Sequence, residues 1–192
     1  MSYINQWSRV FTLANRHGVY IQTVPAALKP TNDVTLSAWY RATEVDLSLG
    51  GTQSPLGSEI VSGANSYLLR LRASVNGAPV RAIEFSKRVG QNAFVSVTGE
   101  ATTFLDGNWH HVAGVASRTG GVTIYYDGVE IASAPAETAD IVYNSSAQSF
   151  WVGRHGDGQV QWDFGGNIDE VRVYTRALSP TEIADLAGGG NN

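Results

Sequence analysis

The sequence predicts an all-β fold, a two-sheet antiparallel sandwich with one short C-terminal helix. Three observations support this prediction. Apolar and polar residues alternate with a period of two between clusters of turn-forming residues, which is typical of half-buried strands. The 192 residues include 21 glycines, which indicates many tight turns. Long helical periodicity is absent, and the chain length fits one all-β domain.

The alternation predicts ten strands. It is clearest in residues 34–42, where Val34, Leu36, Ala38 and Tyr40 share one face. The predicted strands are 18–24, 34–42, 67–75, 80–85, 94–97, 109–116, 122–126, 129–132, 150–153 and 166–174.

A β-hairpin is predicted in the middle of the chain. Residues 109–116 and 122–126 are joined by a Gly-Gly turn, and Asp127-Gly128 then leads into residues 129–132. Asp-Gly favours the type I′ turn, whose twist matches that of the flanking strands.

One short helix is predicted near the C-terminus. Ser179 is a suitable N-cap, Pro180 fits the first helical position, and Glu182 completes a capping box. Gly188 is expected to end the helix.

No internal repeat or linker divides the chain. We expect residues 1–16 to form an N-terminal arm or edge strand and residues 17–192 to form the sandwich, with a long loop at 47–57. If the arm contacts a partner in an assembly, its aromatic residues are the candidates for that contact. These are Tyr3, Trp7 and Phe11.

Composition and charge exclude several functions. The net charge of −4 is mild, and no basic run could follow a phosphate backbone, so we expect no nucleic-acid partner. No apolar stretch approaches the roughly 20 residues of a membrane helix, so we expect no membrane insertion. The absence of cysteine excludes disulfides, thiolate metal sites and a cysteine nucleophile.

Four segments resemble a known family. They are residues 33–42 (DVTLSAWYRA), 108–115 (NWHHVAGV), 125–129 (YYDGV) and 165–179 (GGNIDEVRVYTRALS). Their order and spacing resemble the laminin-G-like jelly-roll domain of the concanavalin A-like superfamily. The resemblance also implies a strand at 60–62. It further implies that one sheet is concave and meets ligands on that face or on the loops at its rim.

The residues of these motifs have structural explanations. We expect Trp109 to fill the core. His110 and His111 alternate across the predicted strand, so one should be half-buried and the other exposed, both with structural hydrogen-bonding roles. Asp169 and Arg172 are expected to form hydrogen bonds with backbone groups of a loop and to pair with neighbouring charged side chains.

Catalysis is not supported by the sequence. The resemblance includes glucanases of this fold, which need a nucleophile and an acid on one strand in an E-x-D-x-x-E spacing, and no such triplet occurs here. Asp169 and Glu170 are adjacent, so they are expected on opposite faces of a strand. No nucleophile-elbow motif is present. A degenerate polysaccharide lyase or glucanase is a remote alternative.

The resemblance leaves a calcium site open. Many relatives hold calcium through loop oxygens, and the pentraxin branch uses two acidic ligands in the loop that corresponds to residues 153–163. Here His155 occupies the position of one of these two acidic ligands. Asp157 is left as the other, and Asp163 is nearby. We therefore expect no required cofactor and name Asp157 and Asp163 as possible Ca²⁺ ligands. The alternative is a polar, glycine-rich turn.

The same loop is the candidate ligand site. Sugars are held by an aromatic face and a few polar groups that fix their orientation. Trp162 lies beside Gln161 and Asp163, with His155 and Asp157 across a presumed hairpin. Alternatively, Trp162 packs against the 47–57 loop or a protein neighbour.

The sequence therefore predicts a non-catalytic, lectin-like module that binds a glycan or protein surface. The alternative is a virion-surface or capsid-decoration protein that uses the same sandwich. The start of the chain lacks a charged segment followed by an apolar core, so we expect no signal peptide. We expect cytoplasmic synthesis, with action at an extracellular or virion surface after release or assembly.

Overall fold

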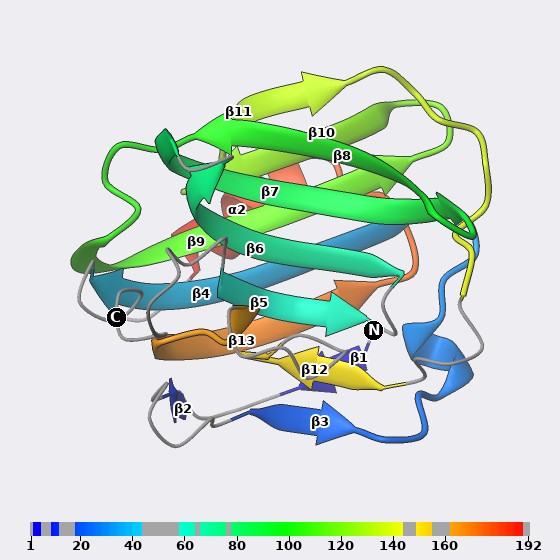
Figure 1. Cartoon of the computed structure of the whole chain (residues 1–192). Coiled ribbons are helices and arrows are strands. Elements are labelled where there is room, and N and C mark those ends of the chain that lie inside the picture. The colour runs from blue at the N-terminus through cyan, green and yellow to red at the C-terminus, as the bar shows by residue number, and fades with distance from the viewer. Residues whose placement is uncertain are drawn as a thin grey trace.

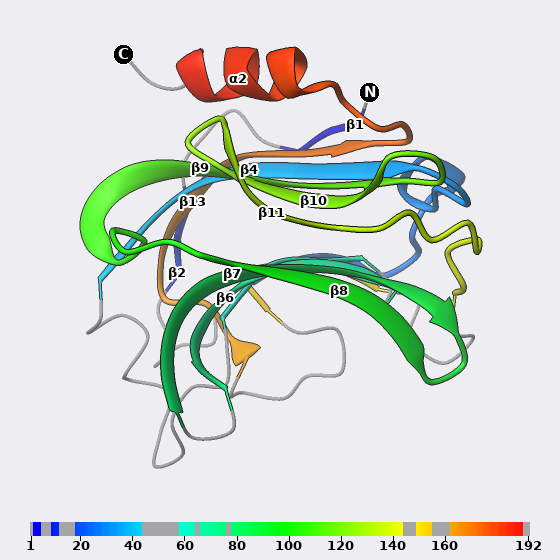
Figure 2. The same cartoon turned by 90° about the horizontal axis from the view of Figure 1, so that it is seen from above.

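A computed structural model describes the chain over residues 2–4, 9–11, 18–43, 58–63, 66–75, 78–143, 149–154 and 162–189. Two antiparallel sheets pack face to face in this part of the chain, and one helix lies outside them (Figures 1 and 2). The predicted sandwich is confirmed. No helix among these residues has the length and apolar character needed to cross a membrane.

One sheet, which we call sheet A, contains seven of the described strands. Its order is β1-β13-β4-β9-β10-β11, and β2 also pairs with β13. The strands are β1 (Ser2–Ile4), β2 (Arg9–Phe11), β4 (Val34–Thr43), β9 (Asp106–Ser117), β10 (Gly121–Tyr126), β11 (Val129–Ala134) and β13 (Gly166–Tyr174).

The other sheet, sheet B, has the order β3-β12-β5-β6-β7-β8. Figure 2 shows β6, β7 and β8 arching away from sheet A at their ends, so the outer face of sheet B is concave. The strands are β3 (Val19–Ile21), β5 (Ser58–Gly63), β6 (Tyr67–Val75), β7 (Ala78–Gly90), β8 (Ala93–Glu100) and β12 (Phe150–Val152). A short 3₁₀ helix, η2 (Ala26–Leu28), was not predicted.

Apolar residues from the inner faces of both sheets form the main core. The face predicted for β4 is confirmed, because Val34, Leu36 and Tyr40 are all fully buried. The sheets approach closely where Phe85 of β7 meets Gly114 of β9. A Cβ added at Gly114 would lie 2.3 Å from the Phe85 ring, so glycine is required at this contact.

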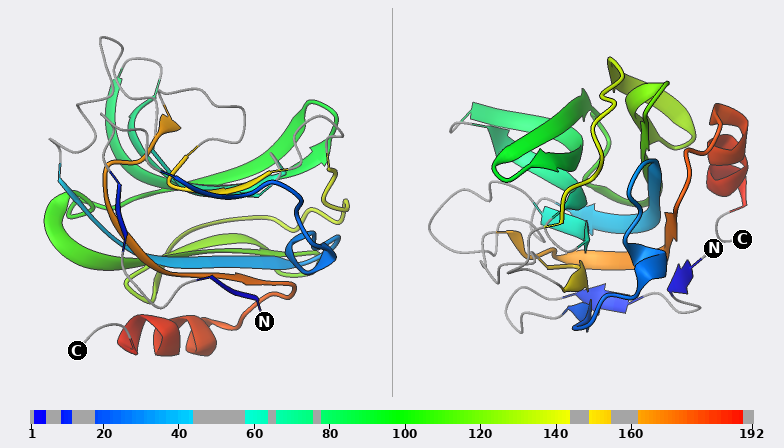
Figure 3. Two further views of the ribbon diagram at one scale, coloured as in Figure 1. Left: turned by 90° about the horizontal axis from the view of Figure 1, so that it is seen from below. Right: turned by 90° about the vertical axis from the view of Figure 1, so that its right-hand side faces the viewer.

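The C-terminal helix α2 (Pro180–Gly188) covers part of the outer face of sheet A (Figure 3). The predicted capping box between Ser179 and Glu182 is confirmed. The helix buries Ile183 in a second apolar cluster together with outward-facing residues of the sheet. These are Ala113, Val115, Tyr125 and Tyr174, joined by Leu178.

This cover explains why two predictions for β9 are wrong. Both His110 and His111 are buried, with 8% and 0% of their surface exposed. His110 is on the same face of β9 as Val112, which points into the core, whereas His111 is on the outer face with Ala113. Both faces of β9 are covered by other residues. Trp109 shares the outward phase, so it is half-buried outside the core, with the Arg41 guanidinium 5.5 Å from its ring.

A β-bulge in β13 also breaks the expected alternation. Ile168 and Val171 are three residues apart, yet both lie in the core. Glu170 has a φ of 51°, and the register against β4 shifts between Asp169 and Arg172. Asp169 and Glu170 are therefore not placed on opposite faces of a regular strand. The predicted roles hold, because Asp169 Oδ1 accepts the Glu170 N–H at 2.7 Å and Arg172 pairs with Glu170.

The described parts of the N-terminal arm pair with their own sheet. The backbones of Tyr3 and Phe11 lie in β1 and β2, which pair with opposite ends of β13. Trp7 and the predicted 47–57 loop lie outside the described residues. That the arm contacts a partner stays a prediction.

The contact between the sheets gives a stability prediction. We expect Gly114→Ala to lower the free energy of unfolding by about 1–3 kcal/mol, because the new methyl group overlaps the Phe85 ring in a packed core. Urea denaturation measures this. Gly188→Ala is the control, because nothing lies within 4 Å of its added Cβ. Equal stability of Gly114→Ala and wild type would contradict the packing described.

Candidate functional site

The candidate site lies on the outer face of sheet B, at the β3–β12 edge seen in Figure 1. Phe150 and Val152 of β12 are buried in the core, so Trp151 between them faces outward. Trp151 pairs with Tyr20 of β3, and their rings stack with centroids 4.6 Å apart. Tyr20 is 55% exposed. The pair forms an aromatic surface that solvent reaches.

Arg154 lies against this pair. Its guanidinium carbon is 5.0 Å from the centre of the Trp151 ring, and its Nε donates to Asp163 Oδ1 at 3.3 Å. Asp163 is only 4% exposed, so this ion pair is largely shielded from solvent. We call Tyr20, Trp151 and Arg154 the aromatic platform.

Local backbone features fix the position of Arg154. Gly153, with a φ of 77°, donates its N–H to Ile60 O and accepts the N–H of Phe164. On the β3 side, a Cβ at Gly18 would lie 2.5 Å from Arg154 Cδ. The absence of a side chain at Gly18 therefore leaves room for the arginine at this position.

A charged cluster continues the site along the same face. The Arg70 guanidinium lies 4.5 Å from the centre of the Trp162 ring. Arg70 and Arg72 of β6 both pair with Glu84 of β7, at 2.9 and 2.7 Å. These three side chains face outward because their strand neighbours, among them Leu71, are in the core.

Two buried polar atoms, one in the platform and one beside it, have no hydrogen-bond partner in the described part of the chain. They are Ser62 Oγ and Trp151 Nε1, which belong to residues paired across β5 and β12. An unsatisfied buried group of this kind costs stability, so such groups are uncommon in native proteins.

The structure places two of the predicted ligand residues at this face. Trp162 stacks on Arg70, and Asp163 holds Arg154. His155, Asp157 and Gln161 lie outside the described residues, so their predicted role stays a prediction.

Sequence reasoning missed the platform itself. The outward position of Tyr20 was visible in its strand pattern, since Val19 and Ile21 flank it. Nothing in the pattern showed that it pairs with Trp151, 131 positions later.

A calcium site is not formed by the described residues alone. No group of three or more His, Asp or Glu side chains among them is arranged to hold a metal ion. Asp163 already accepts a hydrogen bond from Arg154. The calcium prediction therefore depends on Asp157, outside the described residues, and stays a prediction.

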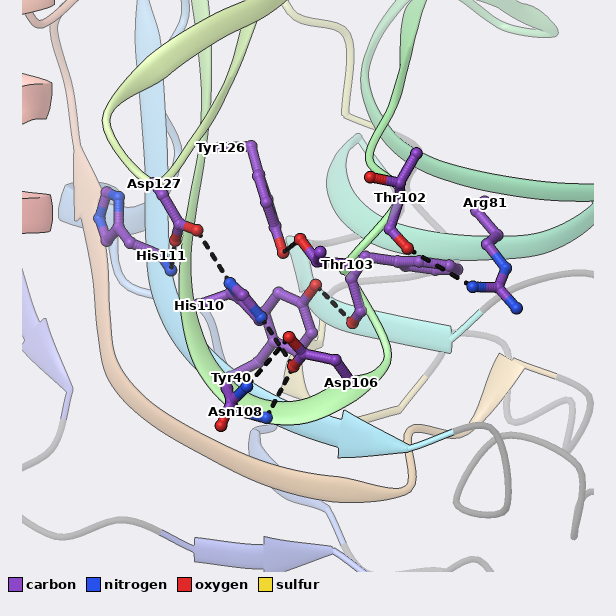
Figure 4. Close-up of polar contacts among 11 residues, drawn as sticks. Tyr40, Arg81, Thr102, Thr103, Asp106, Asn108, His110, His111, Tyr126 and Asp127 are labelled. Atoms are coloured by element: carbon purple, nitrogen blue, oxygen red, sulfur yellow. Dashed lines mark hydrogen bonds and ion pairs between the residues drawn. The ribbon is translucent and has the colours of Figure 1, made fainter.

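A second polar cluster surrounds His110 at one end of the sandwich (Figure 4). His110 Nδ1 lies 2.8 Å from Asp127 Oδ2, and Nε2 lies 3.0 Å from Asp106 Oδ1. Its ring stacks on Tyr126. The N–H of Asn108, together with His110, lowers the pKa of Asp106 to about 2.

This cluster fixes a turn. The other Asp127 carboxylate oxygen accepts the N–H of His111, and Asp127 and Gly128 have φ angles of 48° and 80°. These angles are those of the predicted type I′ turn between β10 and β11. Both ring nitrogens of His110 are used, so we assign the cluster a structural role.

His111 is buried on the other side of β9. Its Nε2 lies 2.8 Å from Ser37 Oγ, and its Nδ1 has no partner in the described part of the chain. Burial, with a smaller effect of the nearby Arg172 charge, lowers the pKa of His111 to about 4.

A family model described as the concanavalin A-like lectin/glucanases superfamily matches residues 15–184. The chain belongs to this superfamily. Membership confirms the family resemblance and the sandwich predicted from the sequence. Among curated protein sequences, none matches the chain significantly.

Several solved structures have a similar fold at low sequence identity. A Bacteroides ovatus protein named as a candidate carbohydrate binding protein has a TM-score of 0.64 at 21% identity, covering 92% of this chain and 45% of that one. The binding domain of Paraclostridial Mosquitocidal Protein 1 has a TM-score of 0.64 at 15% identity, covering 88% and 40%.

A third structure concerns botulinum neurotoxin type C, whose cell entry depends on interaction with two ganglioside molecules. Its TM-score is 0.60 at 13% identity, and the match covers 89% of this chain and 39% of that one. The chain thus spans less than half of these three proteins, and the likeness shows the fold alone.

The buried His111 gives a pH prediction. Because its pKa is about 4 in the folded chain and about 6.5 when unfolded, the unfolded chain binds the extra proton between these values. The contribution of neutral His111 to the free energy of unfolding is therefore fully present above pH 6.5. It falls by about 3 kcal/mol as the pH is lowered toward 4. Urea denaturation across this range should show a smaller fall for His111→Gln. Equal pH profiles would refute the assignment.

The unpartnered hydroxyl gives a second prediction, with a matched control on the opposite sheet. Ser62 and Ser37 are both fully buried, but of the two only Ser37 has a hydrogen-bond partner among the described residues. We expect Ser62→Ala to keep or raise the melting temperature, and Ser37→Ala to cost about 1 kcal/mol. Equal losses in the two variants would show that Ser62 Oγ is hydrogen-bonded.

Proposed function

We propose that this protein is a non-catalytic module that binds glycans at the aromatic platform. The observation that carries the proposal is the exposed Tyr20 ring, stacked on Trp151 beside a fixed arginine. The C–H face of a pyranose packs on an aromatic ring, and planar donors orient its hydroxyls. The platform offers both kinds of group within one small surface.

The platform is held in place before any ligand arrives. Trp151 is fixed by strand pairing on both sides, and Arg154 by Asp163 and the close approach of Gly18. Binding to groups that are already ordered costs little conformational entropy. A weak individual contact such as sugar stacking benefits most from this rigidity.

Two described carboxylates on the outer side of sheet B, Glu84 and Asp163, support binding over catalysis. Retaining and inverting glycosidases use two carboxyl groups on either side of the scissile bond, one as an acid. Here Glu84 is paired with two arginines and Asp163 with Arg154. Both carboxylates thus serve to hold arginines on this face.

The names of two of the structurally similar proteins are consistent with this proposal. One is named as a candidate carbohydrate binding protein, and another concerns entry through gangliosides. The pairing of β1 and β2 with β13 is that of an edge strand, which supports a binding module over a capsid-decoration protein with a free arm.

The proposal is tested by screening the intact protein on a glycan array and measuring affinity for the best ligand by calorimetry. We expect Tyr20→Ala to weaken binding about tenfold or more, since it removes the exposed stacking surface. Phe94→Ala is the control, because Phe94 is an exposed aromatic residue on β8, at the far edge of the same sheet. Wild-type affinity in Tyr20→Ala, or an array without binding, would exclude this function.

A further inference from the structure

We propose that the glycan bound at the platform carries a carboxylate, as in a hexuronic acid, and that the Arg154 guanidinium binds this carboxylate through two hydrogen bonds. The inference rests on the proposed function and names the class of sugar that the same site selects.

The terminal nitrogens of Arg154 are available for a ligand. Nε donates to Asp163, whereas Nη1 and Nη2 have no partner in the part of the chain that the structure describes. The Arg154 side chain is 18% exposed, so solvent reaches part of it. The guanidinium therefore presents one complete edge with two parallel N–H donors, which matches the two oxygens of a carboxylate.

Asp163 determines which edge is presented. Because this buried carboxylate receives Nε, the guanidinium cannot rotate to offer that nitrogen outward without losing the ion pair. Gly18 on one side and the Trp151 ring on the other restrict the side chain further. An arginine with its orientation fixed in this way loses little entropy when it binds a planar anion.

The position of Arg154 relative to Tyr20 fits a sugar acid. Arg154 lies against Gly18, which directly precedes β3 and is two positions before Tyr20. Two strand residues span about 6.6 Å. A pyranose ring stacked on Tyr20 therefore has the substituents of its edge, including a carboxyl group on C5, within reach of the guanidinium.

Charge makes the arrangement selective. A neutral sugar can receive hydrogen bonds from Arg154, but a carboxylate also brings the opposite charge and two coplanar oxygens that accept two parallel hydrogen bonds. The site is partly enclosed, with 18% of the Arg154 side chain exposed, so solvent screens the interaction less than on an open surface. A carboxylate should therefore gain more at this position than a hydroxyl group.

The test uses pairs of ligands that differ only in the carboxyl group. Oligosaccharides of galacturonate, glucuronate, mannuronate and guluronate are each compared with the neutral sugar obtained by reducing their carboxyl groups. We expect the wild-type protein to bind at least one acidic form about tenfold more tightly than its reduced form. Sulfated oligosaccharides form a third arm, and preference for sulfate over carboxylate would overturn the assignment of a uronic acid.

Variants locate the selectivity. Arg154→Gln should reduce the preference for the acidic form to about twofold or less, while Arg154→Lys should keep part of it. Because Arg154→Gln leaves Asp163 buried without its cation, the double variant Arg154→Gln/Asp163→Asn serves as a second test with neutral groups of similar shape. Arg41→Gln is the matched control, since Arg41 also lies over a tryptophan ring, on the opposite sheet.

The outcomes separate the two proposals. If the acidic and reduced sugars bind equally well but Tyr20→Ala abolishes binding, the carboxylate inference is wrong and the glycan-binding function stands. If the preference survives in both Arg154 variants that carry Gln, the inference is also wrong. If none of the sugars binds and the array is empty, both proposals fail.

Discussion

The alternation of side chains along β12 is the constraint on which the candidate site depends. Phe150 and Val152 both lie in the core, so the alternation of side chains along the strand places Trp151 on the outer face. A shift of one residue would bury Trp151 and expose two large apolar side chains. The same register sets Tyr20 beside Trp151 on one side and Ser62 on the other.

The outer faces of the two sheets are used differently. On sheet A, α2 covers part of the face with an apolar cluster, and His111 beneath it is fully buried. On sheet B, the described outward side chains at the β3–β12 edge are aromatic and cationic, with Tyr20 exposed. The outer face of sheet A is thus partly covered by the helix, and the outer face of sheet B is the one on which we propose binding.

Local sequence signals predicted local structure well. Strand alternation, the Asp127-Gly128 turn and the capping box of α2 each depend on residues close together in the chain, and all three are present. Trp109 was misplaced because both faces of β9 are apolar where α2 packs, so the sequence pattern cannot show which phase faces inward. The platform was missed for another reason: it depends on the pairing of β3 with β12, which no local pattern encodes.

Tryptophan indole resonances offer the most direct test of the central claim, that ligands bind at the platform on sheet B. The chain has five tryptophans, each with one indole N–H. Titration of the ¹⁵N-labelled protein with its array-selected oligosaccharide should shift the Trp151 signal and leave those of Trp39 and Trp109 on sheet A unchanged. Shifts at Trp39 and Trp109 with an unchanged Trp151 signal would place the ligand on the opposite sheet and contradict the account.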